Sequence, residues 1–132
     1  MSRPDTVMVI DDNEGLPALF SRYLGESGYT VVGVQNADEG LLLARERPPS
    51  AIVLDIIMPG TDGWAVLAQL KADPVTAGVP VIVCSVFNDP GLAGSLGAAA
   101  CLCKPVSQAT LLRVLAEVTR ESRSTDCADS HR

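Results

Sequence analysis

The sequence predicts a single α/β domain built on a doubly wound parallel sheet. Short, almost continuous apolar runs alternate with helical patterns along the chain. Such runs are typical of strands that are buried on both faces of a parallel sheet. The length of 132 residues suits one hydrophobic core, and 47 % of the residues are apolar. Because only 4 % are aromatic, this core must consist mainly of Val, Leu, Ile and Ala.

Five apolar runs are predicted to be strands, and the segments between them are predicted to be helices. The predicted strands cover residues 7–10, 30–34, 51–54, 79–84 and 100–103. The clearest helices begin near residues 16, 36, 62 and 107. Pro17 lies in the first turn of the first helix, and Gly28 is placed to end that helix. Asn36 and Glu39 form a capping-box pattern at the start of the second helix.

Two segments are less regular. A fourth helix has only residues 88–96 available, and Gly91 and Gly94 each oppose a helix by roughly 1 kcal/mol relative to Ala. We expect that helix to be short or irregular. After residue 120 the chain becomes polar and aperiodic. We therefore expect one domain at 1–120 and a disordered polar tail at 121–132.

The order of the elements predicts the topology. Strands that alternate with helices form right-handed crossovers and a sheet with helices on both faces. Five strands and about five helices suit the flavodoxin-like strand order 2-1-3-4-5.

Charge and hydropathy exclude several classes of protein. The formal net charge is −6 and there is no basic cluster, so we expect no direct binding to nucleic acid. No apolar run approaches the length of a membrane span, and the first residues lack the apolar run of a signal peptide. We therefore expect a cytoplasmic protein that does not bind membranes.

The cysteines do not suggest a zinc site. Cys84, Cys101, Cys103 and Cys127 include no C-x-x-C pair, and His131 is the only histidine. We interpret the cysteines as reduced thiols, and those in apolar segments as small core side chains.

Polar side chains follow four of the predicted strands. Asp11 and Asp12 follow the first strand, Asp55 the third, Ser85 ends the fourth, and Lys104 follows the fifth. Because ligands of open α/β sheets bind beyond the carboxyl ends of the strands, these side chains should meet at one edge. Three neighbouring carboxylates repel one another unless a cation intervenes. Mg²⁺ suits such oxygen ligands, so the set predicts a phosphoryl-transfer site with a carboxylate nucleophile.

Each of these residues alone has a structural explanation. Asp12 or Asn13 could cap the first helix, a serine at a strand end is usually a turn residue, and a lysine there is usually solvated. It is their joint occurrence at the strand ends that favours a site.

The same residues resemble the response-regulator receiver domain family. The acid pair lies in VIDDN at 9–13, and DIIMPGTDG at 55–63 matches the family pattern D-x-x-M-P-x-x-x-G. Ser85 stands where the family has Ser or Thr, and Lys104-Pro105 matches its K-P pair. The resemblance covers about residues 5–120.

The resemblance implies a phosphoacceptor and a metal site. Asp55 would accept the phosphoryl group. Asp12 would be a direct Mg²⁺ ligand, Asp11 would act directly or through water, and the main-chain carbonyl of Ile57 would complete the protein ligands together with Asp55. Mn²⁺ is the alternative cation.

It also implies roles for the residues around the phosphoacceptor. Ser85 would donate a hydrogen bond to the phosphoryl group, and Lys104 would pair with the carboxylate and the phosphoryl oxygens. The peptide bond before Pro105 would be cis. Gly63 would ease the turn into the third helix.

The chain departs from the family at positions that affect switching. Cys101 replaces the usual Tyr or Phe, and Val86 replaces a smaller residue after the hydroxyl position. Ile57 and Phe87 are apolar where polar side chains can orient the hydrolytic water, which in the family tends to accompany slow self-dephosphorylation. The route of signal output is therefore expected to differ.

The expected function is that of a phosphorylatable signalling domain in a two-component phosphorelay, not a turnover enzyme. Its phosphodonor would be a histidine kinase or a histidine phosphotransfer protein, and its output would be binding to a downstream protein, as a monomer or weak dimer. The alternative is a constitutive interaction module that retains the fold without switching. A haloacid-dehalogenase-like phosphatase needs D-x-D after the first strand, whereas this chain has Asp11-Asp12-Asn13.

Overall fold

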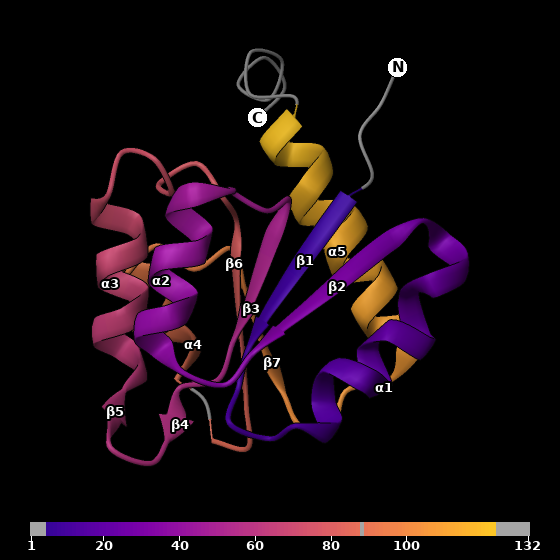
Figure 1. Cartoon of the computed structure of the whole chain (residues 1–132), viewed down its shortest axis with the longest axis horizontal. Coiled ribbons are helices and arrows are strands. Elements are labelled where there is room, and N and C mark those ends of the chain that lie inside the picture. The colour runs from indigo at the N-terminus through magenta and orange to yellow at the C-terminus, as the bar shows by residue number, and fades with distance from the viewer. Residues whose placement is uncertain (1–4, 88, 124–132) are drawn as a thin grey trace.

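A computed structural model describes residues 5–87 and 89–123, with side chains described up to residue 119. Five parallel strands form the main sheet in the order β2-β1-β3-β6-β7 (Figure 1). The strands are β1 (Asp5–Ile10), β2 (Tyr29–Val34), β3 (Ala51–Leu54), β6 (Val81–Ser85) and β7 (Ala100–Cys103). In chain order this arrangement is the predicted 2-1-3-4-5. The flavodoxin-like topology is therefore confirmed.

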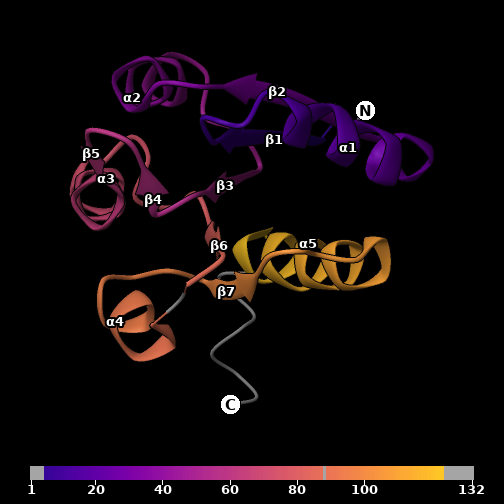
Figure 2. The same ribbon diagram turned by 90° about the horizontal axis from the view of Figure 1, so that it is seen from below.

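Helices cover both faces of the sheet. They are α1 (Gly15–Leu24), α2 (Ala37–Glu46), α3 (Gly63–Ala72), α4 (Pro90–Ser95) and α5 (Gln108–Arg123). Figure 2 shows α1 and α5 on one side of the sheet and α2, α3 and α4 on the other. Within the described ranges, no helix is long and apolar enough to cross a membrane.

Each face of the sheet has its own core. One core contains the buried side chains of Phe20, Leu24 and Leu115, which pack on the α1 and α5 face. The other contains Leu67 and Leu70 from α3. All residues of the central strands β3 and β6 are buried, because helices cover both of their faces. This explains why the sequences of these strands are continuous apolar runs.

Local sequence signals set several helix ends, although α1 ends at Leu24, four residues before the predicted Gly28. The Asn36 side chain accepts a hydrogen bond from the Glu39 amide at 3.0 Å, and this interaction begins α2. A short 3₁₀ helix, Gly25–Ser27, follows α1 and ends at Gly28, whose φ of 89° is the left-handed conformation that glycine favours. The fourth helix has six residues, as expected for a segment with two glycines.

Some boundaries differ from the predicted ones. Helix α5 extends to Arg123, past the predicted domain boundary at residue 120. The rest of the predicted tail, 124–132 with Cys127 and His131, lies outside the described residues. So do residues 1–4, on which the expectation of no signal peptide depends.

A two-stranded hairpin between β3 and α3 was not predicted from the sequence. Its strands, β4 (Ile57–Met58) and β5 (Thr61–Asp62), pair antiparallel. Gly60, with φ of 71°, lies in the turn between them. Two-residue strands are too short to show a periodic pattern, so no sequence signal distinguished them from a loop.

Gly63 is needed for a different reason from the one the resemblance implied. Its φ is not positive, so the turn itself does not require glycine. Instead, a Cβ at this position would lie 2.4 Å from the Cα and 2.5 Å from the carbonyl oxygen of Ile56. The start of α3 therefore packs directly on the backbone that follows Asp55. This contact fixes the hairpin beneath the carboxyl edge of the sheet.

We predict that Gly63→Ala destabilises the fold, because the clash is with backbone that can move only by displacing the hairpin. The expected loss is about 1–3 kcal/mol in the free energy of unfolding, measured by urea denaturation. Gly91→Ala is the matched control. A Cβ at Gly91 would meet only the Asp89 side chain at 3.6 Å, so this variant should be neutral or slightly stabilising. Equal stability of the two variants would contradict this account of Gly63.

Candidate functional site

Three carboxylates meet at the carboxyl edge of the sheet, as the sequence predicts. Asp11 and Asp12 follow β1, and Asp55 follows β3, which is the neighbouring strand. Their ligand oxygens all lie within 4.8 Å of one another. Asp11 and Asp55 are 1 % and 5 % exposed, whereas Asp12 is exposed to solvent. The cluster therefore has a buried base and an open side.

Backbone hydrogen bonds continue the sheet pattern to the two buried carboxylates. The Asp11 amide donates to the carbonyl of Val34, and the Asp55 amide donates to the carbonyl of Ile10, each at 3.0 Å. These bonds fix both residues in the register of the strands that precede them. The positions of the carboxylates thus follow from strand pairing.

Asn13, and not Asp12, makes the local hydrogen bonds at the start of α1. Its amide donates to Asp11 Oδ1 at 2.8 Å, and its side-chain oxygen accepts from the Gly15 amide at 2.9 Å. The expectation that Asp12 or Asn13 caps this helix is wrong, because Glu14 is at the N-cap of α1 and no side chain makes a capping hydrogen bond there. Asn13 instead forms a local turn, and the exposed carboxylate of Asp12 belongs to the cluster.

Lys104 lies between the two buried carboxylates. Its Nζ is 2.6 Å from Asp11 Oδ2 and 3.4 Å from Asp55 Oδ2. Burial alone would lower the pKa of Lys104, but the hydrogen bond and charge of Asp11 and the charge of Asp55 outweigh it and raise the pKa. The lysine is therefore a cation at neutral pH and offsets part of the repulsion among the carboxylates. The Lys104–Pro105 peptide bond is cis, as the resemblance implied.

Each oxygen of Asp55 has a different neighbour. Oδ2 faces Lys104, and Oδ1 accepts a hydrogen bond from the Ile57 amide at 3.0 Å. Both contacts orient the carboxylate. The Ile57 side chain is 48 % exposed beside it.

Ser85 completes the group that the sequence placed at the strand ends. It is fully buried at the end of β6, between β3 and β7, and its carbonyl accepts from the Lys104 amide at 3.0 Å. The preceding Cys84 side chain packs in the core on the opposite face. Burial raises the pKa of the Cys84 thiol to about 12, so it is not a nucleophile at neutral pH.

The residues expected to affect switching lie on the rim or close to it. Val86 and Phe87 are 58 % and 77 % exposed on the segment after β6. Cys101 is half-buried on β7 and packs against the core on the α3 and α4 side. In this position it fills space in the core without presenting a ring to the site.

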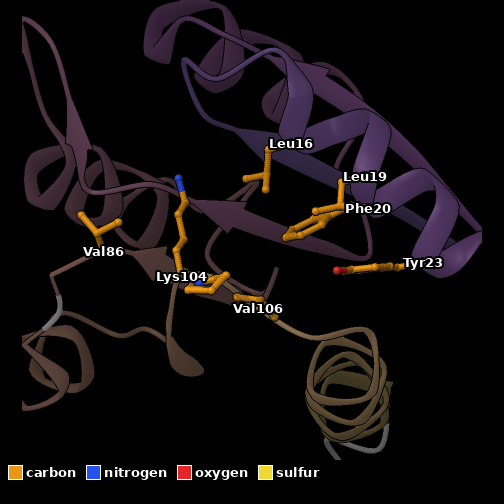
Figure 3. A pocket seen from close by; sticks show the side chains of 8 residues that line it. Leu16, Leu19, Phe20, Tyr23, Val86, Lys104 and Val106 are labelled. Atoms are coloured by element: carbon orange, nitrogen blue, oxygen red, sulfur yellow. The ribbon is translucent and has the colours of Figure 1, made fainter.

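An apolar pocket of about 320 Å³ lies beside the site and was not predicted (Figure 3). The sequence pattern indicates only that the apolar positions of α1 face the core. In the structure Leu16, Leu19 and Tyr23 are half-buried, and they leave this hollow next to Lys104. Its lining consists of Leu16, Leu19, Phe20, Tyr23, Val86, Lys104, Pro105 and Val106.

The donor set suits a hard divalent cation. Mg²⁺ takes oxygen ligands, often from one or two carboxylates with water and phosphate oxygens. Asp11, Asp12 and Asp55 offer carboxylate oxygens on a side open to solvent. The residues present therefore fit Mg²⁺.

Comparison with known sequences identifies the family. The family model described as the response regulator receiver domain matches residues 7–116. Protein PilH of Pseudomonas aeruginosa is 30 % identical over 112 residues, which cover 83 % of this chain and 93 % of PilH. The polar-differentiation response regulator DivK of Brucella anthropi is 36 % identical over 107 residues, covering 79 % and 87 % of the two chains. The match to the response regulator PleD of Caulobacter vibrioides, at 32 % identity, covers 86 % of this chain and 26 % of PleD.

Solved structures share the fold at lower identity. The chemotaxis response regulator CheY4 of Vibrio cholerae superposes with a TM-score of 0.80 at 24 % identity, covering 88 % of this chain and 99 % of that chain. A CheY-like receiver domain protein from Methanospirillum hungatei gives a TM-score of 0.85 at 21 % identity, covering 93 % and 99 %. These structures show the shared fold. The family match over residues 7–116, together with the relatives PilH and DivK, shows that the chain belongs to the response regulator receiver domain family of two-component signalling.

Proposed function

We propose that the chain accepts a phosphoryl group onto Asp55 in a Mg²⁺-dependent reaction and then binds a downstream protein. The donor would be a phosphohistidine of a histidine kinase or of a histidine phosphotransfer protein. Receiver domains are signalling domains that interact with histidine kinases and effectors. The observation that carries the proposal is the cluster of Asp11, Asp12 and Asp55 with Lys104 between two of its carboxylates.

The site can support nucleophilic attack by a carboxylate. An Asp55 oxygen would bond to phosphorus as the bond to the donor imidazole nitrogen breaks, and the imidazole would take up a proton as it leaves. The Ile57 amide and Lys104 already orient the carboxylate. Lys104 and the Ser85 hydroxyl would then stabilise the charge on the transferred phosphoryl oxygens.

Receiver domains bind Mg²⁺ at an acidic pocket, and we assign that role here to Asp11, Asp12, Asp55 and the main-chain carbonyl of Ile57. When bound, Mg²⁺ supplies positive charge that offsets the repulsion between the carboxylates and an incoming phosphoryl group. Mn²⁺ can provide the same oxygen-binding chemistry.

A constitutive interaction module is the second candidate, and Cys101 is the observation that favours it. No aromatic ring is available on β7 to move toward Ser85 after phosphorylation. If the domain does switch, we infer that the change passes through the backbone of the segment between Ser85 and β7. The short helix α4 lies there, with Gly91 and Gly94 in it.

Asp55→Asn should abolish phosphorylation and leave the fold intact, because Asn is nearly isosteric but is not a nucleophile. The assay incubates the full chain with acetyl phosphate and Mg²⁺ and measures the intact mass. Asp38→Asn, which changes an exposed carboxylate on α2, should be labelled like the wild type. Full labelling of the Asp55 variant would refute the assignment, and an unlabelled wild type would favour the constitutive module.

Asp12→Ala should weaken Mg²⁺ binding on the order of tenfold, because a hard cation loses an anionic oxygen ligand. Isothermal titration calorimetry with MgCl₂ measures this affinity, again with Asp38→Asn as the control. An unchanged affinity would show that Asp12 is not a ligand.

Beryllofluoride, which mimics the phosphoryl group, should change amide hydrogen exchange mainly in residues 86–96. The physical reason is that a six-residue helix with two glycines is easily reordered, whereas Cys101 cannot transmit the change by ring rotation. Helix α2 provides the internal control, because it lies away from this segment. Exchange differences confined to other regions would count against this route.

Phosphorylated Asp55 should be long-lived, and Ile57→Asn combined with Phe87→Glu should shorten its lifetime roughly tenfold by helping to orient the attacking water. The exposed apolar side chains of Ile57 and Phe87 offer that water no hydrogen bond. Loss of phosphate is followed by intact mass after removal of the donor. Leu42→Asn, which changes an exposed apolar side chain on α2, should not alter the rate. If the double variant decays at the wild-type rate, these side chains do not set the lifetime.

A further inference from the structure

The apolar pocket beside α1 shares two walls with the candidate site. It lies between α1 and the segment that follows β7, and its volume is about 320 Å³ (Figure 3). Lys104, which contacts Asp11 and Asp55, lines it. Val86, which directly follows Ser85, lines it as well. Any movement of Lys104 or of the backbone at Ser85 would therefore alter the pocket.

The rest of the lining is apolar and comes mostly from α1. Leu16, Leu19 and Tyr23 are half-buried there, and Phe20 is fully buried beside them. The rings of Phe20 and Tyr23 stack with their centroids 6.1 Å apart. Pockets that hold complete small molecules usually measure about 300–1,000 Å³, so this pocket is at the small end of that range. It suits a single large apolar side chain.

The charges beside the pocket favour an occupant that also carries a positive charge. Lys104 is the only charged residue of the lining, and two buried carboxylates hold its Nζ. The exposed carboxylate of Asp12 belongs to the same cluster, and the exposed Glu14 is the N-cap of α1. Arg22 lies in the last turn of that helix, away from this end. Among the described side chains at the start of α1, carboxylates therefore outnumber cations.

We propose that this pocket docks a segment of the downstream protein in which a large apolar side chain is followed by a basic one. The apolar side chain would enter the hollow along α1, and the basic side chain would face Asp12 and Glu14. A buried apolar anchor supplies most of the affinity in such contacts, and complementary charges at the rim supply selectivity and orientation.

The occupant is assigned to the output step because the pocket shares residues with the phosphoacceptor site, and this assignment rests on the proposed function. In that function Lys104 and the Ser85 hydroxyl contact the transferred phosphoryl group, so phosphorylation changes two walls of the pocket. The affinity for the segment would then depend on phosphorylation, and the bound segment would in turn change how readily Asp55 is phosphorylated. A phosphodonor binds before Asp55 is modified, so a pocket that served only the donor would need no such coupling.

The test follows amide NMR signals of the full, isotope-labelled chain during titration with three capped dipeptides, acetyl-Phe-Arg-amide, acetyl-Phe-Gln-amide and acetyl-Phe-Glu-amide. The arginine peptide should bind roughly threefold more tightly than the glutamine peptide, and the glutamate peptide should bind most weakly. The signals that move should belong to α1 and to residues 104–106. Added salt should remove the preference for arginine, because it screens the charges.

Two variants separate the apolar contribution from the charge. Leu16→Asn should weaken the binding of all three peptides roughly fivefold, because it makes the lining polar, and Leu42→Asn on α2 is its control. Glu14→Gln should reduce only the preference for arginine, and Glu46→Gln, at the last residue of α2, should leave that preference unchanged. Glu14 is exposed, so its substitution does not depend on how well the chain tolerates a change in the lining.

Beryllofluoride tests the link to phosphorylation. The affinity of the arginine peptide is compared in Mg²⁺ alone and in Mg²⁺ with beryllofluoride, and it should change roughly threefold or more. The proposal is overturned if the three peptides bind alike, if either Leu16→Asn or Glu14→Gln behaves like the wild type, or if bound beryllofluoride leaves the affinity unchanged. If beryllofluoride shifts no signal near Asp55, the proposed phosphorylation fails, and the output role of the pocket fails with it.

Discussion

The ion pairs of Lys104 with Asp11 and Asp55 join three strand ends that are far apart in the sequence. Two buried carboxylates this close to each other repel strongly. The lysine places a positive charge between them and also helps to set the orientation of the Asp55 carboxylate. The proposed chemistry depends on this balance, because a phosphoacceptor must be an anion held in place.

The fold produces this arrangement through backbone contacts. The pairing of β1, β3 and β6 as neighbours brings their carboxyl ends to one edge. The direct contact of Gly63 with the Ile56 backbone then holds the hairpin after Asp55 close to the sheet. From this hairpin, the Ile57 amide reaches Asp55 Oδ1.

The surface around the site is much less polar than the site itself. Ile57, Val86 and Phe87 are exposed, and an apolar pocket extends from Lys104 along α1. On the α4 side, β7 carries the thiols of Cys101 and Cys103. The carboxylate cluster is thus surrounded by an apolar periphery.

Much of the fold and of the candidate site could be predicted from the sequence itself. Continuous apolar runs predicted the buried strands, local hydrogen-bonding residues such as Asn36 predicted a helix start, and polar residues after strands predicted Asp11, Asp12, Asp55, Ser85 and Lys104 as one group. These features depend on neighbours within a few residues or on the order of elements. The tertiary structure alone decided that Lys104 contacts Asp11 as well as Asp55, and it alone formed the apolar pocket between α1 and residues 104–106. Those outcomes depend on distances between segments remote in the sequence, which no local pattern encodes.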